Sequence, residues 1–122
     1  MGTLVTVPER RVIARSVARA GSEVSRTVGL LSKSKLNDDD GMWFPRCNAV
    51  HTCGMRTAID IVFLGDRLQI VRIVESAKPW RIYHGGTVAA HTVELAPGTA
   101  RRTELRLGDA LVLEDDVAAC EA

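Results

Sequence analysis

Thiol and imidazole side chains lie at even spacing in one segment near the middle of the chain. Cys47, His51 and Cys53 would therefore project from one face of a continuous strand. Thiolate and imidazole groups bind zinc, and a thiol beside an imidazole base is also a nucleophile. Zinc needs a further ligand, however, and catalytic Cys and His side chains usually meet across a fold rather than along one segment. We therefore favour buried thiols beside a hydrogen-bonded histidine over a metal or catalytic site.

A carboxylate lies inside the most apolar run of the chain. Asp60 stands between two isoleucines and follows Arg56 by four residues. A carboxylate buried in such surroundings is costly unless it is hydrogen-bonded or paired with a cation. The pattern favours a structural ion pair with Arg56 or an acceptor that fixes a loop, and a ligand contact is the second interpretation.

Trp80 and Arg81 are adjacent in a chain that has only five aromatic residues. A Trp-Arg pair forms a stacking platform for a planar or anionic ligand, and a Trp that covers the core is the alternative. Further along the chain, His91 and Glu94 have opposite parity in one predicted strand. This parity indicates a surface imidazole and a buried carboxyl that accepts hydrogen bonds.

The first third of the chain predicts two strands and a helix. Residues 4–7 and 12–17 are apolar stretches separated by turn-forming residues, which is typical of two strands. Arginines at positions 11, 15 and 19 also fit one face of a basic helix over the second stretch. A short helix is predicted to follow from Ser22, a capping residue, with apolar residues at 24, 28 and 31 on one face.

The middle of the chain predicts a hairpin. Residues 59–63 and 68–74 are β-branched runs joined at Gly65 and Asp66, the composition of a tight two-residue turn. Both faces of the first run are apolar, so we expect a central strand that is covered on both sides. Before the hairpin, residues 37–41 concentrate Asp and Asn beside Gly and predict a solvated loop.

The last third predicts more short strands and little helix. Residues 88–95 and 110–113 have strand composition, and one helical turn, opened by Pro97 and Thr99, is expected before residue 105. Many short strands with turns between them predict a mainly β fold. We expect a compact β-sandwich or barrel with one or two short helices.

The chain has 122 residues, of which 46% are hydrophobic, and this predicts a single domain over residues 1–122. Basic and acidic residues nearly balance at 16 and 15, although residues 107–122 carry five acidic residues and no basic one. This balance, without a nucleic-acid motif, argues against nucleic acid as a partner.

Three cysteines without paired spacing favour a reducing, cytoplasmic setting. The sequence predicts neither a membrane span nor a standard export signal, and the tail from residue 114 is expected to fray.

An ordered set of motifs runs through the chain: Val50-His51-Thr52, Met55-Arg56, the run from Ile59 to Leu64, Lys78-Pro79-Trp80-Arg81, Val93-Glu94-Leu95, Pro97-Gly98 and Gly108-Asp109. Together they resemble a small prokaryotic family, domain of unknown function 192, over residues 22–113. The resemblance implies a compact, mostly β domain of jelly-roll character, and it implies no activity. Where the family has an aromatic pair and a Phe-Pro step, this chain has Cys53-Gly54 and Thr57-Ala58. A pocket lined by those aromatics in relatives would be more open here.

We expect a non-enzymatic module that binds a small molecule or a protein partner, and we assign it no cofactor, metal or catalytic residue. The expected ligand-binding residues are His51, Thr52, Met55, Arg56, Asp60, Trp80, Arg81 and Glu94. The alternative is a hydrolase-like or metal-assisted enzyme that uses His51 with Cys47, Cys53 or Asp60. A third hypothesis is a structural subunit whose exposed strand edge pairs with another chain. The sequence carries no signal for an oligomeric state.

Overall fold

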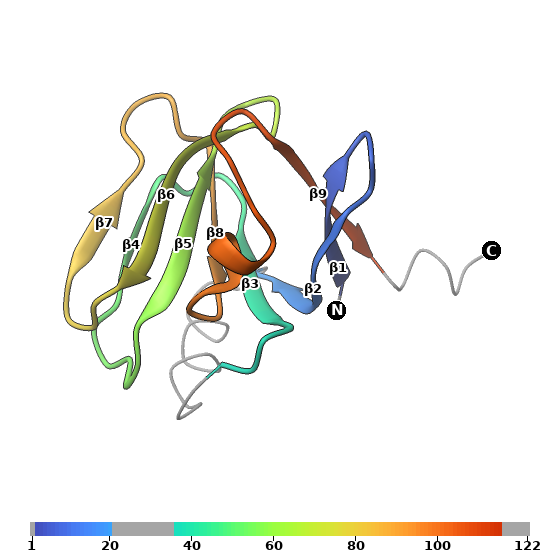
Figure 1. The fold of residues 1–122 in the computed structure, drawn as a ribbon. Coiled ribbons are helices and arrows are strands. Elements are labelled where there is room, and N and C mark those ends of the chain that lie inside the picture. Colours follow the sequence, from blue (N-terminus) through green and yellow to red (C-terminus); the bar gives the residue numbers. More distant parts are fainter. Residues whose placement is uncertain (1, 21–35, 116–122) are drawn as a thin grey trace.

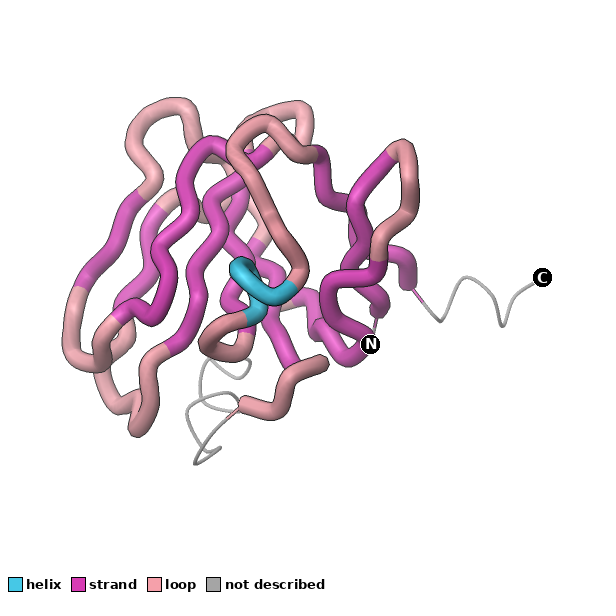
Figure 2. The backbone as a smooth tube through the Cα atoms, in the orientation of Figure 1, coloured by secondary structure: helices cyan, strands magenta, loops and turns pink. Residues whose placement is uncertain are grey.

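Alternating and β-branched apolar runs form strands along most of the chain. The computed structural model describes residues 2–20 and 36–115. Figure 1 shows the arrangement of the elements, and Figure 2 shows how far strands outnumber helix among them. In chain order they are β1 (Gly2–Val7), β2 (Val12–Arg19), β3 (Asp40–Phe44), β4 (Ala49–His51), β5 (Ile59–Leu64), β6 (Ile70–Ala77), β7 (Ile82–His84), β8 (His91–Leu95), α2 (Thr99–Arg102) and β9 (Ala110–Asp115). Within these residues, helical structure never reaches the length needed to span a bilayer.

Seven strands form one mixed sheet in the order β6-β5-β8-β3-β2-β1-β9. The β2–β3 pair is parallel and the other neighbours are antiparallel. The outer strands β6 and β9 do not pair along their length: their first residues meet at an isolated bridge between Gln69 and Ala110 and the backbone hydrogen bonds beside it, so the sheet is not a closed barrel. The short strands β4 and β7 form a second sheet, which lies at the opposite end of the molecule from β1, β2 and β9 (Figure 1). The prediction of a mainly β fold with a short helix is confirmed.

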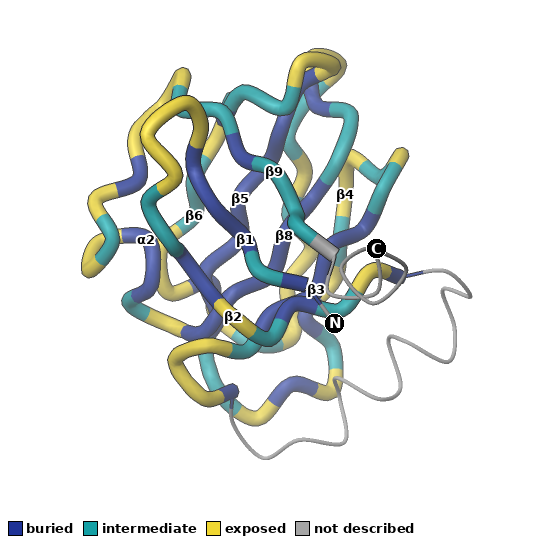
Figure 3. Tube along the Cα trace, turned by 90° about the vertical axis from the view of Figure 1, so that its right-hand side faces the viewer, coloured by how far each residue is buried: buried dark blue, intermediate teal, exposed yellow. Residues whose placement is uncertain are grey.

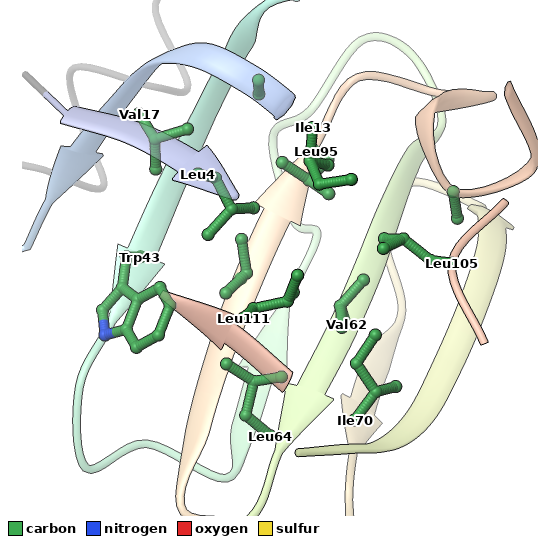
Figure 4. Close-up of a cluster of buried hydrophobic side chains, with 13 residues drawn as sticks. Leu4, Ile13, Val17, Trp43, Val62, Leu64, Ile70, Leu95, Leu105 and Leu111 are labelled. Carbon is green, nitrogen blue, oxygen red and sulfur yellow. The ribbon is translucent and has the colours of Figure 1, made fainter. Parts of the chain in front are cut away.

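Both faces of the large sheet are buried at its centre. In β5, Ile59, Ile61 and Phe63 join one hydrophobic cluster, whereas Val62 and Leu64 join another on the opposite face. All six β5 residues are buried, which confirms the prediction of a central strand covered on both sides. Figure 3 shows β5 and β8 as buried strands enclosed by exposed loops. We call the cluster that contains Val62 the first core, drawn in Figure 4, and the cluster that contains Ile59 the second core.

The predicted hairpin is β5 and β6, but its turn is longer than two residues. The connection spans residues 65–69 and is closed by the Gly65 N–H, which donates to Gln69 O at 2.8 Å. Leu68 and Gln69 do not extend β6 because β9 engages them. The N–H of Leu111 donates to Leu68 O at 3.0 Å, and Gln69 forms the bridge to β9.

Other boundaries differ from the predictions where a neighbouring strand recruits or releases residues. Asp40 and Gly41, expected in a loop, begin β3 because they pair with β2. The residues of β2 form a strand rather than a basic helix, and β8 begins at His91 rather than at residue 88. The predicted helical turn is α2, which begins at Thr99 after Gly98 adopts a φ of 86°. The helix predicted from Ser22 lies outside the described residues.

Asp60 lies fully buried in β5 and joins two other elements to it. Its Oδ1 accepts a hydrogen bond from the Ser76 N–H at 2.9 Å, where β6 has an irregular register opposite Asp60. Its Oδ2 accepts from the Ala100 N–H at 2.9 Å, in the first turn of α2. The N–H groups in the first turn of a helix have no partner within the helix, so the carboxylate supplies one. No ion pair joins Asp60 to Arg56 among the described residues, and Arg56 is exposed.

We predict that Asp60→Asn lowers the free energy of unfolding by about 2 kcal/mol or more, since an amide nitrogen cannot accept from either N–H. Urea unfolding followed by circular dichroism measures this loss. Asp66→Asn, in the exposed hairpin turn, is the control and should change stability by less than about 0.5 kcal/mol. Equal stability of the two variants would contradict the anchoring role of Asp60.

Candidate functional site

The small β4–β7 sheet has an inner and an outer face. Val50 and Tyr83 pair across it and pack against the second core. Side chains alternate along a strand, so the flanking residues point the other way. These outward residues, all exposed, are Ala49, His51, Ile82 and His84.

Thr52 is fully buried and joins the end of β4 to the turn that precedes β7. Its Oγ1 donates to Lys78 O at 2.7 Å and accepts from the Arg81 N–H at 2.9 Å. The Thr52 N–H donates to Arg81 O at 2.8 Å, and Thr52 O accepts from the Trp80 N–H at 3.0 Å. We call residues 78–81 the Trp80 turn. These four hydrogen bonds fix the backbone of the turn on one buried residue.

Trp80 projects into solvent from this turn. Its φ is 63°, in the left-handed region that residues other than glycine rarely adopt, and 66% of the residue is exposed. Ile82 follows in β7 and is 76% exposed. The large hydrophobic residues exposed in the described part are Val7, Trp80, Ile82, Val88 and Leu107. Trp80 and Ile82 therefore lie within three residues of each other, and hydrogen bonds to Thr52 and the pairing of β7 with β4 hold their backbone in place.

Charged side chains surround the Trp80 turn. Lys78 and Arg81 belong to the turn and are exposed. The N–H of Met55 donates to Thr52 O at 3.2 Å, which brings the exposed Arg56 to the same end of the β4–β7 sheet. Met55 itself is buried in the second core, so its hydrogen bond to Thr52 O ties this segment to the interior.

The His51 segment differs from the sequence prediction. A continuous strand through both cysteines is wrong, because β4 ends at His51 and Thr52 turns the chain toward the Trp80 turn. His51 is exposed, and its Nδ1 accepts from the Cys53 N–H at 3.3 Å. The Cys47 thiol donates to Ala49 O at 2.9 Å. Across residues 2–20 and 36–115, no hydrogen bond joins the His51 imidazole to a thiol or to a carboxylate, and no three His, Cys, Asp or Glu residues are grouped to hold a metal ion.

Glu94 is a buried carboxyl on the second-core face of the large sheet. It lies in register between Met42 of β3 and Ile61 of β5, and it is 4% exposed. It makes no ion pair with another described residue. Burial in these apolar surroundings raises the pKa of Glu94 to about 7.

His91 lies on the opposite face of β8 from Glu94, beside the Trp43 ring at a centroid distance of 5.8 Å. Its Nδ1 accepts from the Arg46 N–H at 3.1 Å. Burial, and to a smaller extent the charge of Arg19, lowers the pKa of His91, while Asp66 opposes the shift.

The structure thus gathers six of the predicted residues around the Trp80 turn and separates two from it. The six are His51, Thr52, Met55, Arg56, Trp80 and Arg81. Asp60 and Glu94 lie in the interior, on opposite faces of the large sheet. Sequence reasoning missed Ile82 and Lys78. A single isoleucine in a sequence is usually expected in the hydrophobic core. The exposure of Ile82 follows from the pairing of β7 with β4, which turns its side chain outward.

The model of domain of unknown function 192, described as an uncharacterized ACR, matches residues 5–113. This chain belongs to that family. The match confirms the resemblance seen in the motifs and also includes β2 and the end of β1, which those motifs did not cover. Domain of unknown function 192 has no characterised activity to transfer to this chain.

Two solved structures share the fold. A protein of unknown function from Novosphingobium aromaticivorans is 23% identical, with a TM-score of 0.73, and the match covers 90% of this chain and 83% of that protein. A putative transcription regulator from Sinorhizobium meliloti is 25% identical, with a TM-score of 0.75, and the match covers 92% of this chain and 91% of that protein. No protein of curated function matches this chain.

We predict that Thr52→Val loosens the Trp80 turn and costs about 2 kcal/mol of stability, because Lys78 O and the Arg81 N–H lose their partner. Urea unfolding gives the loss of stability, and tryptic cleavage after Arg81 reports the loosening. Thr52→Ser keeps the hydroxyl and is the matched control. If both variants have the same stability and resist proteolysis equally, Thr52 does not fix the turn through its Oγ1.

Glu94 makes stability depend on pH. Its folded pKa of about 7 lies above the value of 4.5 expected in the unfolded chain, so the folded state binds the proton more tightly. The contribution of Glu94 is therefore most favourable below about pH 4.5 and is lost as the pH rises through about 7. We predict that the stability advantage of Glu94→Gln over the natural chain grows by about 3 kcal/mol between about pH 4 and pH 8. Urea unfolding at several pH values measures it.

Comparing the variant with the natural chain at each pH cancels the contribution of His91, which is present in both proteins. The pKa of His91 is lowered in the folded state, so its own contribution to stability increases as the pH rises. His91→Gln is the control and should reverse the direction of the difference. If the stability difference between Glu94→Gln and the natural chain does not change with pH, burial does not raise the pKa of Glu94.

Proposed function

We propose that this chain is a single-domain, non-enzymatic module that binds a segment of another protein through Trp80 and Ile82. The observation that carries this proposal is a largely exposed indole on backbone that Thr52 holds in a left-handed conformation. An exposed tryptophan is unfavourable in water, and a strained backbone adds to the cost. Binding of a partner that covers Trp80 would remove the exposed indole from water and offset the cost of the left-handed backbone.

Preorganisation supports this role. Tryptophan is among the residues that contribute most at protein interfaces, and such residues act best when little freedom is lost on binding. Four hydrogen bonds to Thr52 already order the Trp80 turn, and the β4–β7 sheet orders Ile82. A partner would therefore meet a rigid apolar anchor, with His51 in register beside Ile82.

The enzyme hypothesis has less support. It requires His51 within hydrogen-bonding distance of a nucleophile or a bound metal. The Nδ1 of His51 instead accepts from a backbone N–H, and the Cys47 thiol donates to a backbone carbonyl. Both oxygens of Asp60 are occupied by backbone N–H groups in the interior. We therefore assign Asp60 and Glu94 to the support of the fold and the other six predicted residues to the binding surface.

The setting that we propose is the cytoplasm, because Cys47 and Cys53 are free thiols. The Sinorhizobium meliloti protein is described as a putative transcription regulator. A module that binds another protein is one way to take part in regulation without contacting DNA, and this agrees with the balanced net charge of the chain.

We predict that peptides selected from an unbiased displayed library bind the natural chain and lose at least about tenfold in affinity with Trp80→Ala, as expected for a central interface anchor. Selection on the natural chain is followed by titration of purified peptides by calorimetry. Val88→Ala is the matched control, because Val88 is 67% exposed but lies away from the turn.

Two results would overturn the proposal. One is that no peptide is enriched over a blank support. The other is that the enriched peptides bind Trp80→Ala as well as they bind the natural chain while the unfolding curves of both proteins agree.

A further inference from the structure

We propose that the segment bound by the Trp80 turn is acidic: an extended peptide with an apolar side chain for Trp80 and Ile82, flanked by Asp or Glu. This inference rests on the proposed function and names the chemical class of its partner. It is carried by the unequal distribution of charge between the two ends of the molecule.

The segments that form the Trp80 turn and the β4–β7 sheet contain basic residues and no acidic ones. Residues 41–59 and 76–93, which include β4, β7 and the turns around them, contain no Asp or Glu, and Glu75 at the end of β6 is paired with Arg101 at 3.4 Å. Lys78 and Arg81 flank Trp80 in the turn, and Arg56 lies at the same end. The N–H of Lys78 donates to the Tyr83 hydroxyl at 2.9 Å, so the backbone of Lys78 is held while its ammonium group stays in solvent.

Five of the ten other basic residues in the described chain form ion pairs with described residues, and Arg19, Arg46, Arg67, Arg72 and Arg106 do not. Those with an acidic partner are Arg10, Arg11, Arg15, Arg101 and Arg102. They lie on the β1–β2 hairpin and on α2, at a distance from β4 and β7 (Figure 1). None of the ion pairs between described residues includes Arg56, Lys78 or Arg81. Three exposed cations without carboxylates around one apolar anchor are complementary to an apolar side chain between acidic ones.

A peptide fits these observations better than nucleic acid or a lipid surface. Single-stranded nucleic acid is held by several aromatic side chains on which successive bases stack, and Trp80 is the only exposed Trp, Tyr or Phe in the described residues. Membrane surfaces attract clusters of four or more basic residues beside a continuous apolar face. Here three cations surround one turn, and the whole chain has a net charge of +1.

The test uses the complete chain and synthetic peptides of about twelve residues without tryptophan. One peptide has a central Leu-Phe pair flanked by Glu, the second has Lys in place of every Glu, and the third has Ser in place of the Leu-Phe pair. Binding is followed by the fluorescence of Trp80 in a Trp43→Phe background and by the anisotropy of labelled peptide with the natural chain. The second measurement does not depend on the folding of the Trp43 variant.

We expect the acidic Leu-Phe peptide to bind at least tenfold more tightly than the other two, and its affinity to fall as salt is raised. Lys78→Glu combined with Arg81→Glu should weaken the acidic peptide at least tenfold and strengthen the Lys peptide. The matched control, Arg67→Glu combined with Arg106→Glu, makes the same change of charge at exposed residues away from the turn and should leave affinity unchanged.

Four outcomes would overturn the inference: tighter binding of an oligothymidylate, tighter binding of phosphatidylglycerol vesicles, self-association of the chain through Trp80 in the absence of peptide, or indifference of binding to the Lys78 and Arg81 charge reversal. If library-selected peptides depend on Trp80 while the charge reversal has no effect, the acidic partner is wrong and the proposed function stands. If selected peptides do not depend on Trp80, the proposed function itself fails.

Discussion

The large sheet must be covered on both faces, and the rest of the structure depends on this constraint. β5 and β8 carry apolar side chains on alternating sides, so each face needs its own cover. On the first core the cover includes α2, which Asp60 holds by accepting from the Ala100 N–H. On the second core it includes the β4–β7 sheet, which packs through Val50 and Tyr83. Apolar contact drives both coverings, while single buried polar side chains determine where the covering elements lie.

Thr52 does for the second cover what Asp60 does for the first. Each is fully buried, and each forms hydrogen bonds to backbone groups of a distant segment. Such a bond contributes modestly while it is made and costs much more when one partner is left unsatisfied, which favours a single arrangement. For the β4–β7 sheet, this arrangement leaves an outer face with nothing packed on it by the described chain. That outer face is where Trp80 and Ile82 are exposed, so the packing that completes the core also creates the candidate binding surface.

Local patterns in the sequence predicted much of this fold. The alternation of apolar residues and the frequency of β-branched residues predicted β1, β2, β5 and β6. Both signals are local, because they depend only on the residues of the strand itself and their immediate neighbours. The boundaries that were wrong lie where a distant strand competes for the same residues. Leu68 and Gln69 are drawn to β9, and Asp40 is drawn to β2. The motif order also identified the family, and six of the eight predicted site residues lie around one turn.

The mainly β class, the doubly covered central strand and the segments that carry the distinctive residues could all be predicted before the fold was known. Each of these follows from residue type and spacing along the chain. Which of those residues come into contact depends on how the chain folds in three dimensions. Arg56 and Asp60 are four residues apart, yet one is exposed and the other is sealed beneath α2. Thr52 and Trp80 are far apart in sequence and are joined by hydrogen bonds. The physical reason is that the pairing of β4 with β7, and the burial of one threonine between them, are long-range interactions that no local pattern encodes.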